Sequence, residues 1–279
     1  MNYQSFVSES KALLVSPAGY GKTYTIVERL KYTQGTQLIL THTHPGVASI
    51  KEKIKTEKIS TNRFQVETIS SFCQNYVQNL YVGHDIPDQE HKHYHSFILD
   101  KAYLLFKSLM VQHIVKSTYA GLFVDEYQDC TKKQHEIMML LSDILPTRIL
   151  GDPLQSIFDF NGDLVDFERD LSNFASYPEL DVPNRWYLNE YNALGDIIKG
   201  YRENLINREP IILKEGISNG LSVLRLEDTD LYSFKSSYSK PLQEIITNRR
   251  NEPSLESLLI LVPKYEEELP SGVRNRGGI

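Results

Sequence analysis

The chain has 279 residues, of which 41% are hydrophobic and 24% are charged, and its formal net charge is −6. This composition is that of a globular protein with one large domain, or with one domain and part of another. It excludes the strongly basic class of nucleic-acid-binding proteins, although a local basic groove can coexist with a negative remainder.

The cysteines and the N-terminus indicate the compartment. Cys73 and Cys130 have no CxxC or Cys/His ligand spacing, so we expect neither a structural zinc site nor a disulfide framework. The first residues lack the basic segment and long apolar stretch of a signal peptide. No run approaches the ~18 apolar residues of a membrane span. We therefore expect a cytoplasmic protein.

Short apolar runs alternate with amphipathic segments through the first half of the chain. The runs predict strands at 12–16, 37–41, 64–67, 121–125 and 148–151. The amphipathic segments predict helices at 22–32, 47–54, 70–81 and 132–141. Strands that alternate with helices form βαβ units, so we expect an α/β fold with a parallel sheet flanked by helices.

The rest of the chain is less regular. Residues 82–95 are polar and hold four histidines, whose spacing does not favour a zinc site, and a helix is expected over 96–115. A further helix is expected over 187–202, with strands at 221–226 and 258–262 and an unstructured tail at 268–279. We expect a first domain over 1–180 and part of a second over 181–279.

A glycine-rich loop follows the first predicted strand and opens the first helix. Its sequence, SPAGYGKT at 16–23, ends as a Walker A loop does, although Ser16 stands where the pattern has glycine. Glycines let backbone N–H groups surround phosphates, while Lys22 reaches the β and γ oxygens and Thr23 ligates Mg²⁺. The predicted ATP-binding residues are Pro17, Ala18, Gly19, Tyr20, Gly21, Lys22 and Thr23.

Two acids end the predicted strand at 121–125. At this position Asp125 is placed to hold Mg²⁺, and Glu126 to orient and deprotonate the attacking water. An isolated Asp-Glu pair is more often a solvated strand end. The Walker A loop earlier in the same chain favours the catalytic interpretation.

Five segments together resemble those of UvrD/Rep-like superfamily 1 DNA helicases. DEYQD at 125–129 resembles the DExQD box, and GDPLQSIFDFNG at 151–162 resembles GDxxQSIYxFRG. The other three are LTHTHPGVA at 40–48, VETISSF at 66–72 and LDVPNR at 180–185, which lie where the family has TFTNxAA, GTFH-like and LxxNYR segments. The resemblance covers about residues 1–205 and implies a RecA-like motor domain that uses ATP and Mg²⁺.

The resemblance also implies roles for further residues near the nucleotide. Gln155 would contact the γ-phosphate and couple it to the DNA groove. Arg185 would act as an arginine finger, which neutralises charge during phosphoryl transfer. Gln4 would contact adenine, as the family's upstream glutamine does.

Single-stranded DNA is the partner that the family binds. Residues at 41–44 and 68–70 would contact its backbone, and Phe160 would stack on a base, which suits a protein that holds any sequence. For Phe160 the alternative is core packing, and for the histidines a polar loop. The predicted DNA-binding residues are Thr41, His42, Thr43, His44, Thr68, Ser70 and Phe160.

The chain departs from the family in several places. Asn184 replaces the tyrosine before the finger arginine, Asn161 replaces an arginine, and the accessory insertion is reduced to 82–120. We find no segment like the second-domain boxes, one of which carries a second arginine. The resemblance then implies an incomplete second RecA-like domain and a chain that does not unwind DNA by itself. Either the sequence is a fragment or prematurely ended reading frame, or a protein partner supplies the rest of that domain.

Three functions remain open at this stage. The first is an ATP-driven translocase or helicase on single-stranded DNA. The second is an ATP-binding regulatory or defence-complex subunit without turnover, since compact UvrD-like proteins also occur in anti-phage systems such as Gabija. The third is a non-helicase P-loop NTPase, against which the segment at 151–162 argues.

Overall fold

The computed structural model describes residues 3–156, 165–178, 180–213, 216–218 and 221–223. The chain divides into two compact units, residues 1–203 and 204–279. Within the described ranges, no helix combines the length and the apolar character that crossing a membrane requires.

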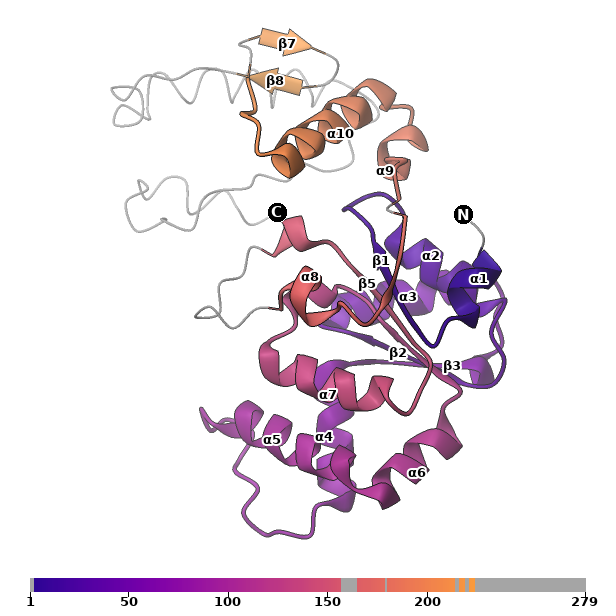
Figure 1. Cartoon of the computed structure of the whole chain (residues 1–279), viewed down its shortest axis with the longest axis vertical. Helices are drawn as coiled ribbons and strands as arrows, with labels where there is room; N and C mark the ends of the chain where they lie inside the picture. Colours follow the sequence, from indigo (N-terminus) through magenta and orange to yellow (C-terminus); the bar gives the residue numbers. More distant parts are fainter. Residues whose placement is uncertain (1–2, 157–164, 179, 214–215, 219–220, 224–279) are drawn as a thin grey trace, which may run out of the picture. The chain divides into compact units, whose positions relative to one another are not determined.

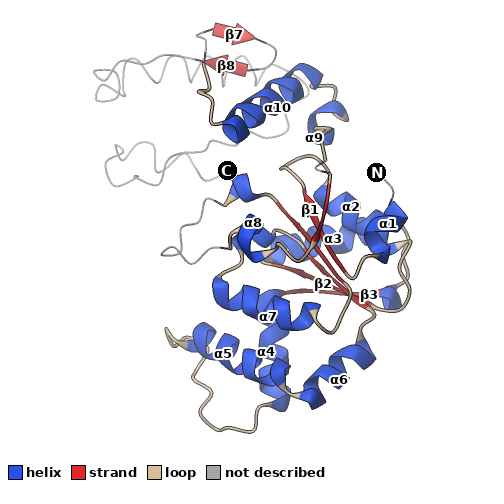
Figure 2. Cartoon of the chain, in the orientation of Figure 1, coloured by secondary structure: helices blue, strands red, loops and turns tan. Residues whose placement is uncertain are grey.

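A six-stranded sheet forms the centre of the first unit (Figure 2). Its order is β3-β2-β4-β5-β1-β6, and all neighbouring strands are parallel. Strands β2, β4 and β5 are buried along their whole length, as expected for parallel strands with both faces covered. The strands are β1 (Lys11–Val15), β2 (Gln37–Thr41), β3 (Phe64–Thr68), β4 (Gly121–Val124), β5 (Thr147–Gly151) and β6 (Ala175–Tyr177).

Helices cover the two faces of the sheet in separate groups (Figure 1). One face packs against α1 (Tyr3–Ser8), α2 (Lys22–Leu30) and α3 (His44–Thr56). The other packs against α4 (Ile69–Leu80), α5 (Tyr94–Lys107), α6 (Leu109–Thr118), α7 (Lys132–Ser142) and α8 (Phe167–Asp170). Because side chains alternate along a strand, Ile39 of β2 joins the first core while Leu38 and Leu40 join the second. The expected α/β fold with a flanked parallel sheet is confirmed.

The single helix expected over 96–115 is wrong. Two helices, α5 and α6, meet at Ser108, whose backbone is extended at φ −72° and ψ 130°. Both pack into the core, where the Phe106 ring stacks on Phe72 of α4 with the ring centres 5.6 Å apart. Much of the stretch expected to be a reduced insertion is therefore part of the main hydrophobic core.

The helix expected over 187–202 is also interrupted. A short helix, α9 (Asn184–Tyr187), is followed by α10 (Asn192–Asn207). Between them Glu190 has φ 64°, which an α-helix cannot accommodate. Further on, β7 (Gly216–Ser218) and β8 (Leu221–Val223) pair as an antiparallel hairpin. The strand expected at 258–262 and the expected tail lie outside the described residues.

Three short 3₁₀ helices complete the described secondary structure that bears on the site. They are η1 (Thr61–Arg63), η2 (Tyr127–Asp129) and η3 (Pro153–Gln155). The last two follow β4 and β5 directly, so each turns the chain sharply at the carboxyl end of a central strand.

Candidate active site

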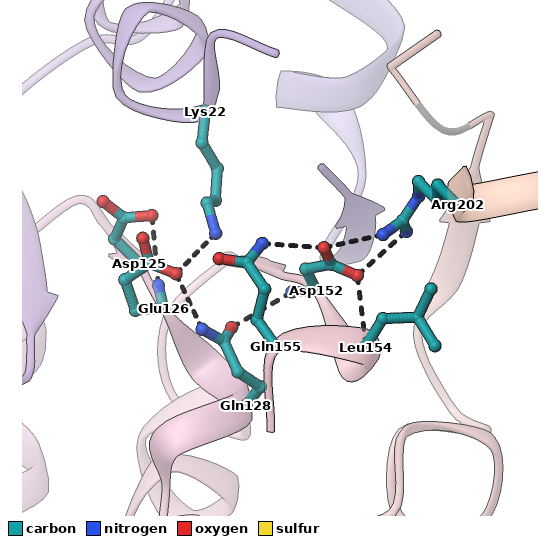
Figure 3. Close-up of polar contacts among 8 residues, drawn as sticks. All are labelled: Lys22, Asp125, Glu126, Gln128, Asp152, Leu154, Gln155 and Arg202. Carbon is teal, nitrogen blue, oxygen red and sulfur yellow. Dashed lines mark hydrogen bonds and ion pairs between the residues drawn. The ribbon is translucent and has the colours of Figure 1, made fainter. Parts of the chain in front are cut away.

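The carboxyl ends of β1, β4 and β5 meet at one edge of the sheet. Val15 of β1 is opposite Gly151 of β5, and Val124 of β4 is opposite Ile149 of β5. The segments that follow these strands carry the glycine-rich loop, the acid pair and Asp152. Open parallel sheets bind ligands at this edge, so the three segments form one candidate site (Figure 3).

The loop between β1 and α2 is shaped by two glycines with positive φ. Gly19 has φ 79° and Gly21 has φ 102°, which side-chain-bearing residues adopt only at a cost. The Gly21 carbonyl accepts the first helical hydrogen bond from Thr25 N at 2.8 Å. Lys22 and Thr23 therefore begin a helix at the end of the loop, where backbone N–H groups attract anions.

Ser16, the residue that departs from the Walker A pattern, is fully buried. Its backbone N–H donates to the Gly151 carbonyl at 2.9 Å and fixes the loop to β5. Its hydroxyl has no hydrogen-bond partner among the described residues. A small residue is accommodated here, and the loop keeps its course.

The two acids at the end of β4 differ in environment. Asp125 is 4% exposed, and its Oδ1 accepts from Glu126 N at 3.0 Å. Burial, and then repulsion by Glu126, raise the pKa of Asp125 to about 7, against the opposing effect of Lys22. Glu126 is partly exposed and has φ 54°, an uncommon backbone conformation for a residue with a side chain. This conformation turns the chain at the point where the two carboxylates are needed.

Glu126 connects the acid pair to the loop. Its Oε2 pairs with Lys22 Nζ, and the same oxygen accepts from Gln128 Nε2 at 2.8 Å. The side chain of Lys22 is only 7% exposed, so the ammonium group is held beside the acids away from bulk water.

The donors at this edge fit ATP·Mg²⁺. Mg²⁺ prefers oxygen ligands and takes few from the protein, the rest being water and phosphate oxygens. The Thr23 hydroxyl and the Asp125 carboxylate are such oxygens, and Lys22 supplies a cation for phosphate. At Gly21 an added Cβ would have its nearest neighbour, Asn184 Nδ2, at 3.5 Å, so this part of the loop backbone can be closely approached.

A buried carboxylate lies behind the acid pair, at the end of β5. Asp152 is 1% exposed and forms a two-pronged ion pair with Arg202 of α10, at 2.8 and 2.9 Å. Its Oδ2 also accepts from Gln155 Nε2 at 2.7 Å, and its Oδ1 from Leu154 N at 3.2 Å. Its backbone N–H donates to Gln128 Oε1 at 3.0 Å. Gln128 thus joins Asp152 to Glu126 (Figure 3).

The segment of the predicted finger arginine lies against the glycine-rich loop. Arg185 N donates to the Gly19 carbonyl at 2.8 Å, and Asn184 Nδ2 donates to the Tyr20 carbonyl at 2.9 Å. The Trp186 ring covers Gly19, where an added Cβ would lie 2.7 Å from the ring. The Arg185 side chain is exposed, and Gln4 is exposed on α1.

The predicted DNA-binding segments lie side by side at the ends of β2 and β3. Thr41 is opposite Thr68 in the parallel register, but both side chains are buried. Thr68 Oγ1 accepts from Ser71 N at 3.0 Å and caps α4. The accessible side chains are Thr43, His44 and Ser70.

His42 is turned toward the core. Its Nε2 lies 3.4 Å from Cys130 Sγ, and burial lowers the pKa of His42 to about 4. The imidazole is therefore neutral near pH 7 and offers no positive charge to a phosphate. Phe160 lies outside the described residues.

Sequence patterns missed several residues that the structure brings to this site. Gln128 lies in DEYQD and Asp152 lies in GDPLQSIFDFNG, but neither residue has a role assigned from the sequence. Their positions in these two motifs are the features that could have indicated one. For Asn184 and Trp186, the one feature of the sequence that indicates a place in the site is that they flank Arg185. Arg202 gave no signal, because nothing in a helical segment indicates a partner 50 residues earlier.

Parts of the chain are similar in sequence to known proteins. Residues 86–173 match the UvrD/REP helicase N-terminal domain. The Gabija protein GajB of Bacillus cereus is 32% identical over 126 residues, which are 43% of this chain and 24% of that protein. The ATP-dependent DNA helicase PcrA of Staphylococcus aureus is 24% identical over 242 residues, which are 76% of this chain and 32% of PcrA. The chain thus matches less than two thirds of the length of these relatives.

Among solved structures, a Pif1 helicase from Bacteroides matches 93% of this chain and 59% of its own, with 10% identity and a TM-score of 0.35. The family match and the curated relatives confirm the resemblance to the N-terminal part of UvrD/Rep-like superfamily 1 helicases.

Proposed function

From its relation to the N-terminal part of UvrD/Rep-like superfamily 1 helicases, we propose that this chain binds and hydrolyses ATP with Mg²⁺ and couples hydrolysis to single-stranded DNA. The observation that carries the proposal is the meeting of Lys22, Glu126 and Gln155 at the ends of β1, β4 and β5. Three segments far apart in sequence supply a phosphate cation, a base and a polar side chain to one edge.

The roles follow from position and chemistry. Gly19–Thr23 surrounds the phosphates, and Lys22 exchanges its contact with Glu126 for a phosphate oxygen. Glu126 is then released to accept a proton from the attacking water. Thr23 and Asp125 would hold Mg²⁺, which would supply positive charge to the phosphate oxygens.

Two further side chains are proposed to act on the γ-phosphate. Gln155 reaches it from the end of β5, and Arg185 reaches it from α9, whose backbone is already bonded to the loop. An arginine in this role neutralises the charge of the transferred group. Gln4 remains the candidate for adenine.

Single-stranded DNA is proposed to bind at the ends of β2 and β3. Thr43, His44 and Ser70 are exposed there and offer hydrogen bonds to backbone phosphates. Thr41 and Thr68 support this surface from beneath, and His42 contributes as a neutral ring. Phe160 remains the candidate for base stacking. Such contacts are sequence-tolerant and weaken as salt rises.

The name of the PcrA relative, an ATP-dependent DNA helicase, supports ATP and DNA as ligands. We also propose that the chain acts with a protein partner, and the GajB relative, a Gabija protein, supports this setting. A cytoplasmic location is part of the proposal.

ATP hydrolysis by the 279-residue chain, with and without a thymidine oligonucleotide, tests the proposal. We expect measurable hydrolysis that the oligonucleotide stimulates. Lys22→Ala should abolish nucleotide binding measured by calorimetry, while its circular dichroism spectrum stays unchanged. The matched control is Lys31→Ala, at the far end of α2, where Lys31 pairs with Glu28 and Glu57.

The outcomes separate the alternatives. Binding without turnover favours the regulatory subunit, and turnover that ignores DNA favours a non-helicase NTPase. A Lys22→Ala variant that binds ATP as tightly as the parent chain contradicts the site itself.

A further inference from the structure

The ion pair between Arg202 and Asp152 is unlike the other ion pairs of the described residues. The Asp152 side chain is 1% exposed and that of Arg202 is 14% exposed, whereas the other pairs each include a partner at least 33% exposed. A surface pair contributes little, but a buried carboxylate that loses its cation is left with an uncompensated charge. Arg202 therefore compensates the buried negative charge of Asp152.

Asp152 also connects to three proposed catalytic groups, to Gln155 directly and to Glu126 and Lys22 through Gln128. Asp152 Oδ2 accepts a hydrogen bond from Gln155 Nε2, and the Asp152 backbone N–H donates to Gln128 Oε1. Gln128 Nε2 donates to Glu126 Oε2. Glu126 in turn contacts Lys22. An unbroken series of polar contacts thus runs from α10 to the glycine-rich loop (Figure 3).

The segment that carries Arg202 is attached to the loop at its other end. Residues 183–202, here termed the clasp, begin where Asn184 and Arg185 bond to the carbonyls of Tyr20 and Gly19. The clasp has two anchors: the glycine-rich loop at its start and Asp152 at its end.

A close approach and a hydrogen bond join the two helices of the clasp. Gly195 of α10 is buried against α9, and an added Cβ would lie 2.9 Å from the Tyr187 ring and 3.2 Å from Pro183. The Tyr187 hydroxyl donates to Asp196 Oδ1. These two contacts connect α9, whose backbone bonds to the loop, to α10, which carries Arg202.

We propose that Arg202 is a positioning residue, and that the clasp transmits occupancy of the glycine-rich loop to Gln155 through the Arg202–Asp152 pair. This inference rests on the proposed ATP-binding function and adds a residue and a route to it. Arg202 is not proposed to contact a phosphate. It acts through Asp152, and the two-pronged geometry requires the planar guanidinium.

Hydrogen–deuterium exchange of the 279-residue chain tests the route directly. A non-hydrolysable ATP analogue with Mg²⁺ should slow exchange at residues 17–23, and also at 152–156 and 192–202. In Arg202→Ala the protection at 17–23 should stay, while the added protection at 152–156 should disappear. Arg169→Ala, which removes an exposed arginine with an aspartate partner, is the matched control and should behave as the parent chain.

A second variant keeps the test valid where Arg202→Ala fails to fold. The double change Arg202→Ala with Asp152→Asn removes both charges, so no uncompensated carboxylate is buried. It should fold and still lack the nucleotide-dependent protection at 152–156. If it keeps that protection, or if the parent chain shows protection only at 17–23, the inference is overturned while nucleotide binding stands. No protection at 17–23 in the parent chain overturns the proposed function, and the inference with it.

Kinetics give an independent readout. Arg202→Ala should lower kcat by about tenfold and leave KM for ATP within about threefold, as loss of a supporting hydrogen-bond partner does. Arg202→Lys should recover only part of kcat. In a Gln155→Ala background, Arg202→Ala should cause little further loss, because both changes interrupt one route. Fully multiplicative losses would show that Arg202 does not act through Gln155.

Discussion

The two ends of the sheet edge are built differently. At β1, β4 and β5 the site residues are buried or partly buried and bonded to one another, as in the series Lys22, Glu126, Gln128 and Asp152. At β2 and β3 the accessible residues Thr43, His44 and Ser70 are on the surface. The hydrogen bond described for this outer group is a cap, from Gly46 N to Thr43 Oγ1 at 3.1 Å.

The difference has a physical consequence. Changes within a bonded network are coupled, whereas changes at separate surface positions add independently. One end is therefore suited to a reaction that requires several groups at once. The other is suited to weak, repeated contacts with a polymer. Variants at the two ends of the edge test this contrast, and their expected effects range from a large loss of hydrolysis to almost no change.

The largest effect is expected for Glu126→Gln. The amide keeps the shape of the carboxylate but cannot accept the proton, so ATP hydrolysis should fall by ~10²–10⁴. Nucleotide binding should be kept, as calorimetry would measure. Glu136→Gln, on the exposed face of α7, is the control and should hydrolyse ATP normally. Equal rates for Glu126→Gln and the parent chain would remove Glu126 from this role.

The next effect concerns stability and pH. Burial raises the pKa of Asp125 to about 7, so the folded chain keeps a proton that the unfolded chain releases above about pH 4. This group therefore lowers the stability of the parent chain as pH rises from about 4 to about 7. An asparagine side chain at the same position has no such proton to lose.

Asp125→Asn should accordingly be more stable than the parent chain, by about 1–3 kcal/mol at pH 8 and by less at pH 5.5. Urea unfolding in a chelating buffer without nucleotide measures this. Asp100→Asn, an exposed aspartate on α5, should show no such dependence. A gain that is equal at both pH values would mean that Asp125 is not held protonated by burial.

Smaller effects are expected on the outer surface. Thr43→Ala, His44→Ala and Ser70→Ala should each weaken binding of a thymidine oligonucleotide by about twofold to fivefold, as loss of one hydrogen bond does. Their effects should multiply in the triple variant. Fluorescence anisotropy at two salt concentrations measures this, with Ser96→Ala as the control. A triple variant that binds as tightly as the parent chain would place the DNA elsewhere.

The smallest effect is expected for Arg169→Ala. Arg169 is 67% exposed and bonds the adjacent Asp170 at the surface of α8. Its removal should change the free energy of unfolding by less than about 0.5 kcal/mol and leave ATP hydrolysis unchanged. A larger loss would show that surface pairs near β5 share in the network.

Several main strands, among them β1, β2 and β4, could be predicted because each contains a continuous apolar run. Residues 37–41 were predicted with the observed limits, and the helix at 132–141 differs from α7 by one residue. Predictions were poorer where local geometry decides. The break at Ser108 and the positive φ of Glu190 divide helices that the apolar pattern alone joins. The exposed three-residue strand β6 has no apolar pattern to find.

The site was predicted in the same uneven way. Lys22 lies in a Walker A-like loop, and Asp125 and Glu126 follow an apolar strand. These patterns indicate a phosphate-binding lysine and an acid pair. The pair of Arg202 and Asp152 depends on where α10 lies relative to the end of β5, which the pattern of a single sequence does not indicate. The burial of His42 against Cys130 likewise arises from tertiary packing, since its position after a strand end favours exposure as much as burial.

The placement of Trp186 has one more consequence. It is the only tryptophan in the chain, and its indole lies edge-on to Tyr20 at 6.5 Å between ring centres, over Gly19. Indole emission depends on the polarity and the quenching groups around the ring. Entry of a triphosphate beside Gly19 would change both. Where a nucleotide binds as proposed, the chain would therefore carry an intrinsic optical signal of its occupancy, readable without a label and specific to the loop where the clasp begins.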